Sequence, residues 1–379
     1  MNNSILTNVP SMSIGKAAEL LSNAFVSVIN KNLPVTTIPS VMLWGSPGVG
    51  KSQGVRQMAA RIEKETKKKV NVTDVRLLLF NPIDLRGIPT ANEDKTLAVW
   101  LRPQIFNMDP SDDVINVLFL DEISAAPQSV QAAAYQITLD RTVGEHKLPD
   151  NCIVIAAGNR VTDKSVAYKM PKALANRLLH IDIQPNFDSW RAWAVEKGIS
   201  DRIIGFISFK RSKLMDFDPT TDDLAFATPR SWELVSNILS NIDDKEDNLI
   251  DLISGIIGIG TAVELRTWLR VYQNLPDIES IFKGTCKTVP KGTDSLYALS
   301  SSMVAYVREH KKDMKAIINS INYCQKLPVE YSVLTLKDYL YIDDELKIRL
   351  LKTPEYARWL NEKGAIINAI ASRRREERY

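Results

Sequence analysis

Residues 41–52 read Val-Met-Leu-Trp-Gly-Ser-Pro-Gly-Val-Gly-Lys-Ser, a short apolar run that passes directly into the pattern G-x-x-x-x-G-K-S. Glycines at this spacing let the backbone curl around an anion, so that several N–H groups can point at one phosphate. Lys51 adds a mobile positive charge, and Ser52 opens a helical pattern whose N-terminus favours an anion. The alternative is a glycine turn that precedes a helix by chance. The strand pattern before the glycines and the amphipathic pattern after them favour a phosphate-binding loop.

The composition is that of an ordinary globular chain. Of its 379 residues 45% are hydrophobic, which is enough to fill more than one core. The net charge of +3 is too small to demand nucleic acid or an anionic membrane as a partner. The three cysteines lack the spacing of a zinc site or a disulfide framework. The sequence shows neither a leader pattern at its start nor a run of eighteen apolar residues. We therefore expect a soluble, cytoplasmic protein without a membrane span.

Short apolar runs alternate with helical patterns after the loop, which predicts a parallel sheet covered by helices on both faces. A helical pattern also precedes the first strand. The predicted strands are residues 41–44, 75–80, 117–120, 153–157 and 179–183. From about residue 189 the strand patterns stop. The clearest helical patterns there cover residues 190–197, 229–242, 262–272, 296–309 and 345–351, and residues 283–294 read as a long loop.

Two carboxylates, Asp121 and Glu122, end the apolar run that begins at residue 117. Charges at the end of a buried strand are costly unless they face a cleft that holds a cation. Asp121 would then bind Mg²⁺ through a water molecule beside Ser52, and Glu122 would polarise the water that attacks the γ-phosphate. The alternative is an acidic helix cap. The position of the pair downstream of the lysine loop favours the catalytic interpretation.

Three more polar side chains stand at element ends. Asn159 follows the run 153–157, and its amide can hold both an attacking water and a phosphate, although an Asn can also simply satisfy a turn. Arg177 precedes the run 179–183, where a guanidinium could reach the nucleotide of a neighbouring subunit; the alternative is a surface ion pair. Arg230 lies in the first turn of a predicted helix, where its charge opposes the helix dipole. We therefore expect an anion, such as an ATP phosphate, near Arg230.

The order of these parts over roughly residues 15–275 resembles that of the AAA+ ATPases, and within them the MoxR-like group of the helix-2-insert branch. By this resemblance the loop is a Walker A motif. The nucleotide would be bound by Gly45, Ser46, Pro47, Gly48, Val49, Gly50, Lys51, Ser52 and Gln53, and Mg²⁺ by Ser52 and Asp121. The catalytic residues would be Lys51, Glu122 of Walker B, Asn159 as sensor 1, Arg177 as arginine finger and Arg230 as sensor 2.

Two segments carry the narrower resemblance. Residues 87–102 and 141–148 resemble the hairpin insertions of this branch, and they would either grip a client near a central pore or pack between subunits. The sequence also departs from the family pattern. Arg160 follows Asn159 where the family has a small residue, which makes Arg160 a rival of Arg177 as the finger, and residues beyond about 285 match no familiar pattern.

The resemblance implies the following organisation. A flexible start (1–14) precedes an α/β nucleotide-binding domain (15–188) with a five-stranded parallel sheet, a helical lid domain (189–285) and a C-terminal helical extension (286–379). It also implies a ring, commonly a hexamer, with Mg-ATP between neighbours. Hydrolysis would remodel, activate or mature a protein client in the manner of a chaperone, often alongside a protein with a von Willebrand factor A domain.

Two other functions stay open at this point. A nucleic-acid motor or loader would carry a basic stripe with interleaved aromatics, which is missing, although the basic residues 373–378 keep this alternative open. A non-hydrolysing scaffold would use ATP only to join subunits, and the joint presence of Glu122, Asn159 and Arg177 argues against it. ATP is favoured over GTP because the sequence has no Asn-Lys-x-Asp signature.

Overall fold

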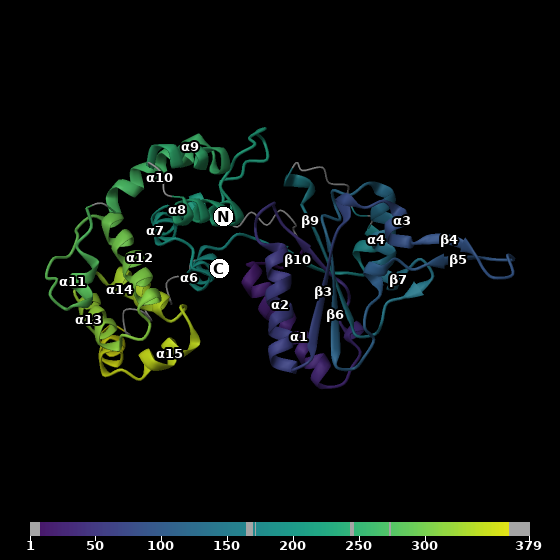
Figure 1. Ribbon diagram of the computed structural model, residues 1–379, viewed down its shortest axis with the longest axis horizontal. Coiled ribbons are helices and arrows are strands. Elements are labelled where there is room, and N and C mark those ends of the chain that lie inside the picture. The colour runs from purple at the N-terminus through teal and green to yellow at the C-terminus, as the bar shows by residue number, and fades with distance from the viewer. Residues whose placement is uncertain (1–7, 164–169, 171, 243–245, 273, 364–379) are drawn as a thin grey trace. The chain divides into compact units, whose positions relative to one another are not determined.

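The computed structural model describes residues 8–163, 170, 172–242, 246–272 and 274–363 (Figure 1). These residues divide into two compact units. The first contains the chain up to Asn186 together with the short segment Asp218–Asp222, and the second contains Phe187–Phe217 and the chain from Asp223 onward. The basic residues 373–378 lie outside the described residues. Within the described part of the chain, we find no helix with the length and hydrophobicity that a bilayer crossing requires.

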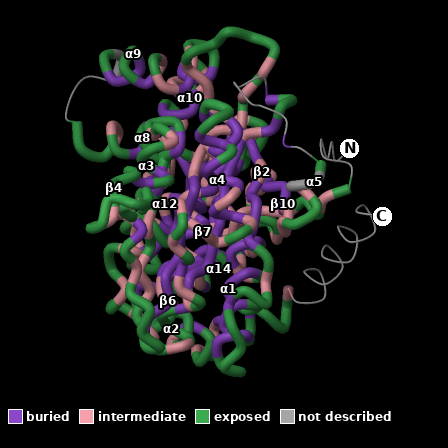
Figure 2. The backbone as a smooth tube through the Cα atoms, turned by 90° about the vertical axis from the view of Figure 1, so that its right-hand side faces the viewer, coloured by how far each residue is buried: buried purple, intermediate pink, exposed green. Residues whose placement is uncertain are grey.

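A parallel sheet forms the centre of the first unit. Its described strands number six, in the order β1-β10-β2-β9-β6-β3, and every neighbouring pair is parallel. The strands are β1 (Ser11–Met12), β2 (Val41–Trp44), β3 (Lys69–Arg76), β6 (Val114–Asp121), β9 (Cys152–Gly158) and β10 (Leu179–Ile183). All of β9, and all of β6 except Asp121, is buried. The tube is also mostly purple around the label of β2 in Figure 2. The predicted α/β fold with a parallel sheet is therefore confirmed.

Two details of the predicted sheet are wrong. The sheet has a sixth strand, because Ser11 and Met12 in the segment predicted as flexible pair with Asp182 and Ile183 of β10. A two-residue edge strand is too short to produce a periodic signal. The second predicted strand was placed at 75–80, whereas β3 ends at Arg76 and a 3₁₀ turn follows. β3 is an edge strand in which only Val75 is buried, so its first residues do not form an apolar run. The apolar run that was predicted as the strand begins only at Val75 and continues into the 3₁₀ turn.

Helices cover both faces of this sheet. In Figure 1, α1 (Ile14–Asn30) and α2 (Lys51–Thr66) lie on one face, and α3 (Pro82–Arg86) and α4 (Gln128–Asp140) lie on the other. The remaining pieces are α5 (Lys172–Ala175) and the 3₁₀ turns η1 (Val35–Thr37), η2 (Leu77–Leu79), η3 (Gln104–Phe106) and η4 (Val161–Asp163). Because the strands are parallel, their carboxyl ends gather the loops after β2, β6 and β9 at one edge.

Both predicted hairpins are present. One consists of β4 (Ile88–Ala91) and β5 (Ala98–Leu101), which extend away from the sheet of the first unit (Figure 1). The other consists of β7 (Thr142–Val143) and β8 (His146–Lys147). The two hairpins touch, since the Nε2 atom of His146 lies 2.7 Å from the carbonyl oxygen of Trp100.

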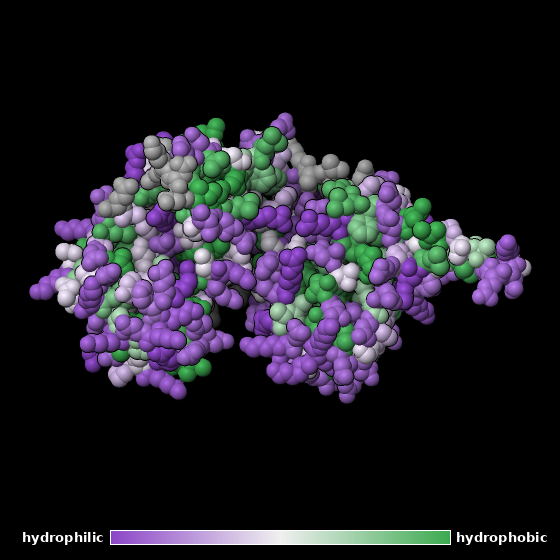
Figure 3. Space-filling view, in the orientation of Figure 1, coloured by the Kyte–Doolittle hydropathy of each residue, from purple (hydrophilic) through white to green (hydrophobic). Residues whose placement is uncertain are grey.

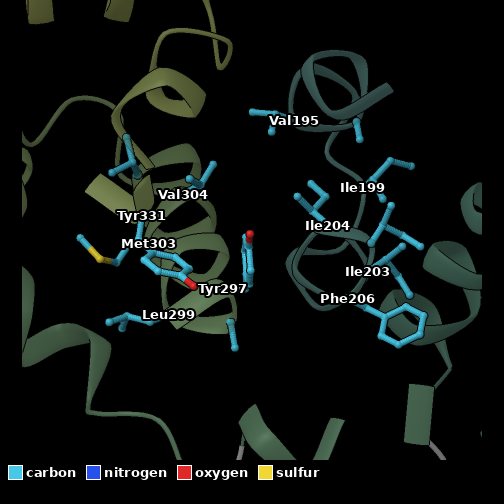
Figure 4. Packing of buried hydrophobic residues seen from close by; sticks show 14 of the residues in the cluster. Val195, Ile199, Ile203, Ile204, Phe206, Tyr297, Leu299, Met303, Val304 and Tyr331 are labelled. Atoms are coloured by element: carbon cyan, nitrogen blue, oxygen red, sulfur yellow. The ribbon is translucent and has the colours of Figure 1, made fainter. Parts of the chain in front are cut away.

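The second unit is helical in its described residues, as predicted. Its elements are α6 (Phe187–Lys197), α7 (Asp201–Phe209), η5 (Arg211–Leu214), α8 (Pro229–Asn241), α9 (Glu246–Ile257), α10 (Ile259–Tyr272), α11 (Ile278–Phe282), α12 (Thr293–Glu309), α13 (Met314–Cys324), α14 (Val329–Tyr339) and α15 (Asp344–Leu351). One hydrophobic core runs from Trp190 to Trp359. Figure 4 shows Ile204 and Phe206 of α7 across from Tyr297 and Val304 of α12. The segments expected as a lid and as a C-terminal extension therefore share one core.

Candidate functional site

The glycine loop between β2 and α2 adopts a conformation that side chains would prevent. Gly48 and Gly50 have φ angles of +78° and +94°, in the left-handed region that other residues rarely adopt. Gly45 has no space for a side chain, because a Cβ atom there would lie 2.9 Å from the carbonyl oxygen of Ile183. The amide of Gly45 also donates to the carbonyl of Gly158. The loop is thus held closely against β9 and β10.

Lys51 joins this loop to the end of β9. Its side chain is buried, and its Nζ atom donates to the carbonyl oxygens of Gly45 and Ser46 and to Oδ1 of Asn159, the last at 3.0 Å. The structure therefore brings together the lysine and the amide that the sequence separately predicted to act on the nucleotide phosphates.

Ser52 and Asp121 form the second contact of the site. The hydroxyl of Ser52 donates to Oδ2 of Asp121 over 2.8 Å, across the gap between the first turn of α2 and the end of β6. Hydroxyl and carboxylate oxygens are ligands that Mg²⁺ takes alongside phosphate oxygens and water. The two residues therefore fit a magnesium ion that is shared with a nucleotide.

Glu122 follows Asp121 in an unusual backbone conformation. Its φ angle is +61°, which is uncommon for a residue other than glycine, and its amide donates to Oδ1 of Asp121 over 2.9 Å. The carbonyl oxygen of Glu122 accepts from the amides of Ala125 and Ala126, which holds the turn. Residues in sparsely populated conformations gather at functional sites, where the surrounding structure over-determines them.

Ser124 and Gly158 connect the ends of β6 and β9. The backbone amide of Asn159 donates to the hydroxyl of Ser124 over 2.8 Å. Gly158 makes this approach possible, since a Cβ atom there would lie 2.9 Å from that hydroxyl. Sequence reasoning missed Ser124, whose only signal is its place two residues after the acidic pair.

Arg160 is buried, and its side chain binds residues of the same chain. It is 3% exposed and its guanidinium donates to Asp182, to the carbonyl oxygen of Ile183 and to the hydroxyl of Ser46. Its backbone amide donates to Asp163. A guanidinium engaged in this way does not fit the role of a finger that reaches a neighbouring subunit. Sequence reasoning also missed Asp163 and Asp182. The position of Asp182, a charged residue inside a predicted apolar strand, could have indicated a buried ion pair.

Comparison with known protein families agrees with this geometry. Residues 40–180 match the family described as ATPase family associated with various cellular activities (AAA). This segment is an AAA-family ATPase domain. It contains the glycine loop, the acidic pair and Asn159, and the protein is accordingly an ATP hydrolase. No curated protein matches the chain.

Several solved structures are similar to this chain at low identity. A RuvB mutant of Thermotoga maritima is 16% identical over 78% of this chain and 86% of its own, with a TM-score of 0.39. A putative ATPase of Cytophaga hutchinsonii is 13% identical over 81% of each chain, with a TM-score of 0.31. NtrX of Brucella abortus is 12% identical over 83% of this chain and 67% of its own, with a TM-score of 0.33. At such identities and TM-scores, none of them indicates what this protein acts on.

Arg177 is exposed in the turn between α5 and β10. The turn is held by His180, whose Nδ1 atom accepts from Nε1 of Trp44 at 3.0 Å and whose Nε2 atom lies 2.8 Å from the carbonyl oxygen of Ala175. Since Nδ1 accepts, Nε2 carries the proton and donates to Ala175. Arg177 is therefore presented at the surface by a fixed turn.

Arg230 belongs to the second unit. As predicted, α8 begins with Thr228 as its cap and Pro229 in its first turn, and Ser231 completes a capping box with Thr228. Arg230 is exposed in this first turn. Its role toward a nucleotide stays a prediction.

Proposed function

We propose that this AAA ATPase is a MoxR-like ring, commonly a hexamer, that uses Mg-ATP hydrolysis to remodel, activate or mature a protein client. The observation that carries the narrower assignment is the pair of hairpins. They interrupt the AAA core where that group carries insertions, and they contact each other through His146 and Trp100. A von Willebrand factor A domain protein is the partner class that the MoxR-like resemblance favours.

The β4–β5 hairpin has the properties of a client-binding element. Ile88, Leu97 and Leu101 are 59%, 67% and 57% exposed, and hydrophobic residues reach along the hairpin in Figure 3. Its tip is ordered by Asn92, whose Oδ1 atom accepts from the amides of Thr96 and Leu97. Exposed apolar side chains on a structured projection support contact with another polypeptide.

In the proposed reaction, each site residue has a separate task. Lys51 and the loop amides would hold the phosphates, and Ser52 and Asp121 would hold Mg²⁺, which supplies positive charge against the phosphate oxygens. Glu122 accepts a proton from the attacking water, and the amide of Asn159 orients that water against the γ-phosphate.

Two arginines complete the proposal from outside this set. The exposed Arg177 of a neighbouring subunit would approach the γ-phosphate from the other side, where a guanidinium neutralises the developing charge. Arg230 would contact ATP from the helical unit. Arg160 is left out of this role because it is enclosed by Asp182, Ile183 and Ser46.

A mixing experiment tests the shared site. Lys51→Ala subunits lack a nucleotide site but keep Arg177, and Arg177→Ala subunits have the opposite defect. Each variant alone should be inactive, and mixing them should restore part of the ATPase activity, because some sites then pair an intact loop with an intact arginine. Sedimentation analysis would show whether the two variants assemble. If they assemble and the mixture still regains no activity, Arg177 does not act on the site of a neighbouring subunit.

The client is tested separately with a ring locked by Glu122→Gln. Proteins held by this variant in the presence of ATP, and not by Lys51→Ala, are candidates. A true client should change its protease sensitivity when the wild-type ring hydrolyses ATP. Deletion of residues 92–95 should abolish that change while ATP turnover continues. Salt-sensitive DNA binding together with DNA-stimulated ATPase activity would instead support the nucleic-acid motor.

We also place the protein in a reducing compartment such as the cytoplasm. Cys152, Cys286 and Cys324 are free thiols, and Cys152 and Cys324 are buried. Such residues behave as small apolar side chains in a protein that is not stabilised by disulfides. Localisation of a tagged copy would test this placement.

A further inference from the structure

Four polar side chains are buried in and beside the phosphate loop, and we call them the Arg160 cluster: Ser46, Arg160, Asp163 and Asp182. They are 9%, 3%, 5% and 0% exposed. Nε of Arg160 lies 2.6 Å from Oδ1 of Asp182, and its Nη1 atom lies 3.3 Å from the hydroxyl of Ser46. That hydroxyl donates to Oδ1 of Asp163 over 3.1 Å.

The cluster is expensive to bury. Removing a guanidinium and two carboxylates from water costs several kcal/mol per ion, roughly the amount that their attraction returns, so hydrophobic residues of similar volume would stabilise the fold about as well. The cluster therefore calls for a reason beyond stability.

The position of the guanidinium supplies this reason. Arg160 directly follows Asn159, whose side chain accepts from Lys51. The same guanidinium holds Ser46, the second residue of the phosphate loop, and its Nη2 atom donates to the carbonyl oxygen of Ile183 over 2.8 Å. One side chain thus ties together the loop, the end of β9 and the end of β10.

We propose that Arg160 is a positioning residue for ATP hydrolysis, which sets the distance between the phosphate loop and the Asn159 amide by holding Ser46, Asp182 and Ile183 at once. This inference rests on ATP hydrolysis by the domain and not on the proposed ring or client. A planar guanidinium has donors in fixed directions for three such acceptors, whereas a lysine ammonium at this site would lose the fork geometry.

The second unit offers a matched control. Arg191 and Asp338 form an ion pair between α6 and α14 with side-chain exposures of 3% and 1%. This pair is as buried as that of Arg160 and Asp182, but its residues have no place in the nucleotide site. Arg191→Met therefore reports what the loss of a buried ion pair does to folding alone.

The experiment compares Arg160→Lys, Ser46→Ala and Arg191→Met by melting temperature, kcat and KM for ATP. Arg160→Lys keeps the positive charge, so we expect only a small decrease in its melting temperature. Its kcat/KM should fall by about 10- to 100-fold, which is the loss expected when a catalytic group is displaced by about 1 Å. Ser46→Ala leaves the pair of Arg160 and Asp182 in place and should lower kcat/KM with little change in melting temperature. Arg191→Met should lower the melting temperature and leave kcat and KM of the folded protein unchanged.

A double variant separates positioning from general damage. If Arg160 acts through Asn159, Asn159→Ala combined with Arg160→Lys should be no slower than Asn159→Ala alone, because effects within one unit are not additive. Additive losses, or a wild-type kcat/KM in both Arg160→Lys and Ser46→Ala, would overturn the proposal. If Arg160→Lys fails to fold, Asp182→Asn takes its place, because it loosens the same guanidinium without changing a residue of the phosphate loop.

Discussion

Gly45→Ala should weaken nucleotide binding through a steric conflict that the structure locates. The added Cβ atom would lie 2.9 Å from the carbonyl oxygen of Ile183 and 3.2 Å from Cγ2 of Val49. The carbonyl cannot easily withdraw, because Arg160 donates to it over 2.8 Å. The loop must therefore move outward by a few tenths of an ångström, and overpacking of this kind costs about 1–3 kcal/mol.

The expected effect on binding follows from this shift. The backbone amides of the loop are aimed at one phosphate, and a displacement of the whole loop misaligns all of them. We expect the affinity for a non-hydrolysable ATP analogue to fall by about tenfold or more, since 1.4 kcal/mol corresponds to a factor of ten. Titration with a fluorescent analogue measures the affinity, and thermal melting measures the stability.

Gly255→Ala is the matched control. Gly255 lies in α9, and a Cβ atom there would meet nothing within 4 Å. Alanine should stabilise the helix by about 0.5–1 kcal/mol and leave nucleotide binding unchanged. If Gly45→Ala binds the analogue as tightly as the wild type does, the loop is not fixed against β10 and the steric argument is wrong.

Three further predictions follow from the same contacts. Glu122→Gln should bind ATP normally but lose nearly all turnover, as measured by phosphate release; normal turnover would remove Glu122 as the base. Asp121→Asn should raise the Mg²⁺ concentration that half-saturates the ATPase, because a charged partner of Ser52 is lost; an unchanged magnesium dependence would contradict the metal assignment. Burial raises the pKa of Asp201 above its ordinary value of 3.8, so its contribution to stability is full below that value and is lost as the pH rises through the folded pKa. Asp201→Asn should therefore flatten the fall in melting temperature as the pH rises, and parallel curves for the two proteins would contradict this.

The strands that were placed correctly share one physical property. β2 and β10 agree with the predicted runs residue for residue, and β9 extends its run by one residue at each end. The inner strands of a parallel sheet are covered on both faces and are therefore mainly apolar, so they are visible in a single sequence even where a polar residue such as Asp182 interrupts the run. β3 lies at the edge of the sheet and is mostly exposed, so polar residues hide it.

The helices of the second unit divide in a similar way. Those with long amphipathic patterns, such as α8 and α12, were predicted, whereas α7 and α14 were not. α7 is Asp201–Phe209, only nine residues long and with six buried residues in a row, and a short apolar run of this kind cannot be assigned to a helix or a strand from its pattern alone. Only packing against α12 shows its conformation.

Chain order alone predicted the candidate nucleotide site: the glycine loop, Ser52 and Asp121 could be grouped because parallel strands deliver their carboxyl ends to one edge. Tertiary structure decided the fate of Arg160. The same guanidinium would serve as a finger on a surface and serves as an internal tie when Asp182 and Ser46 enclose it. Burial depends on which strands become neighbours, and β9 and β10 flank β2 only after the chain has folded. The residues next to an arginine in the sequence therefore do not show which strands will enclose its side chain.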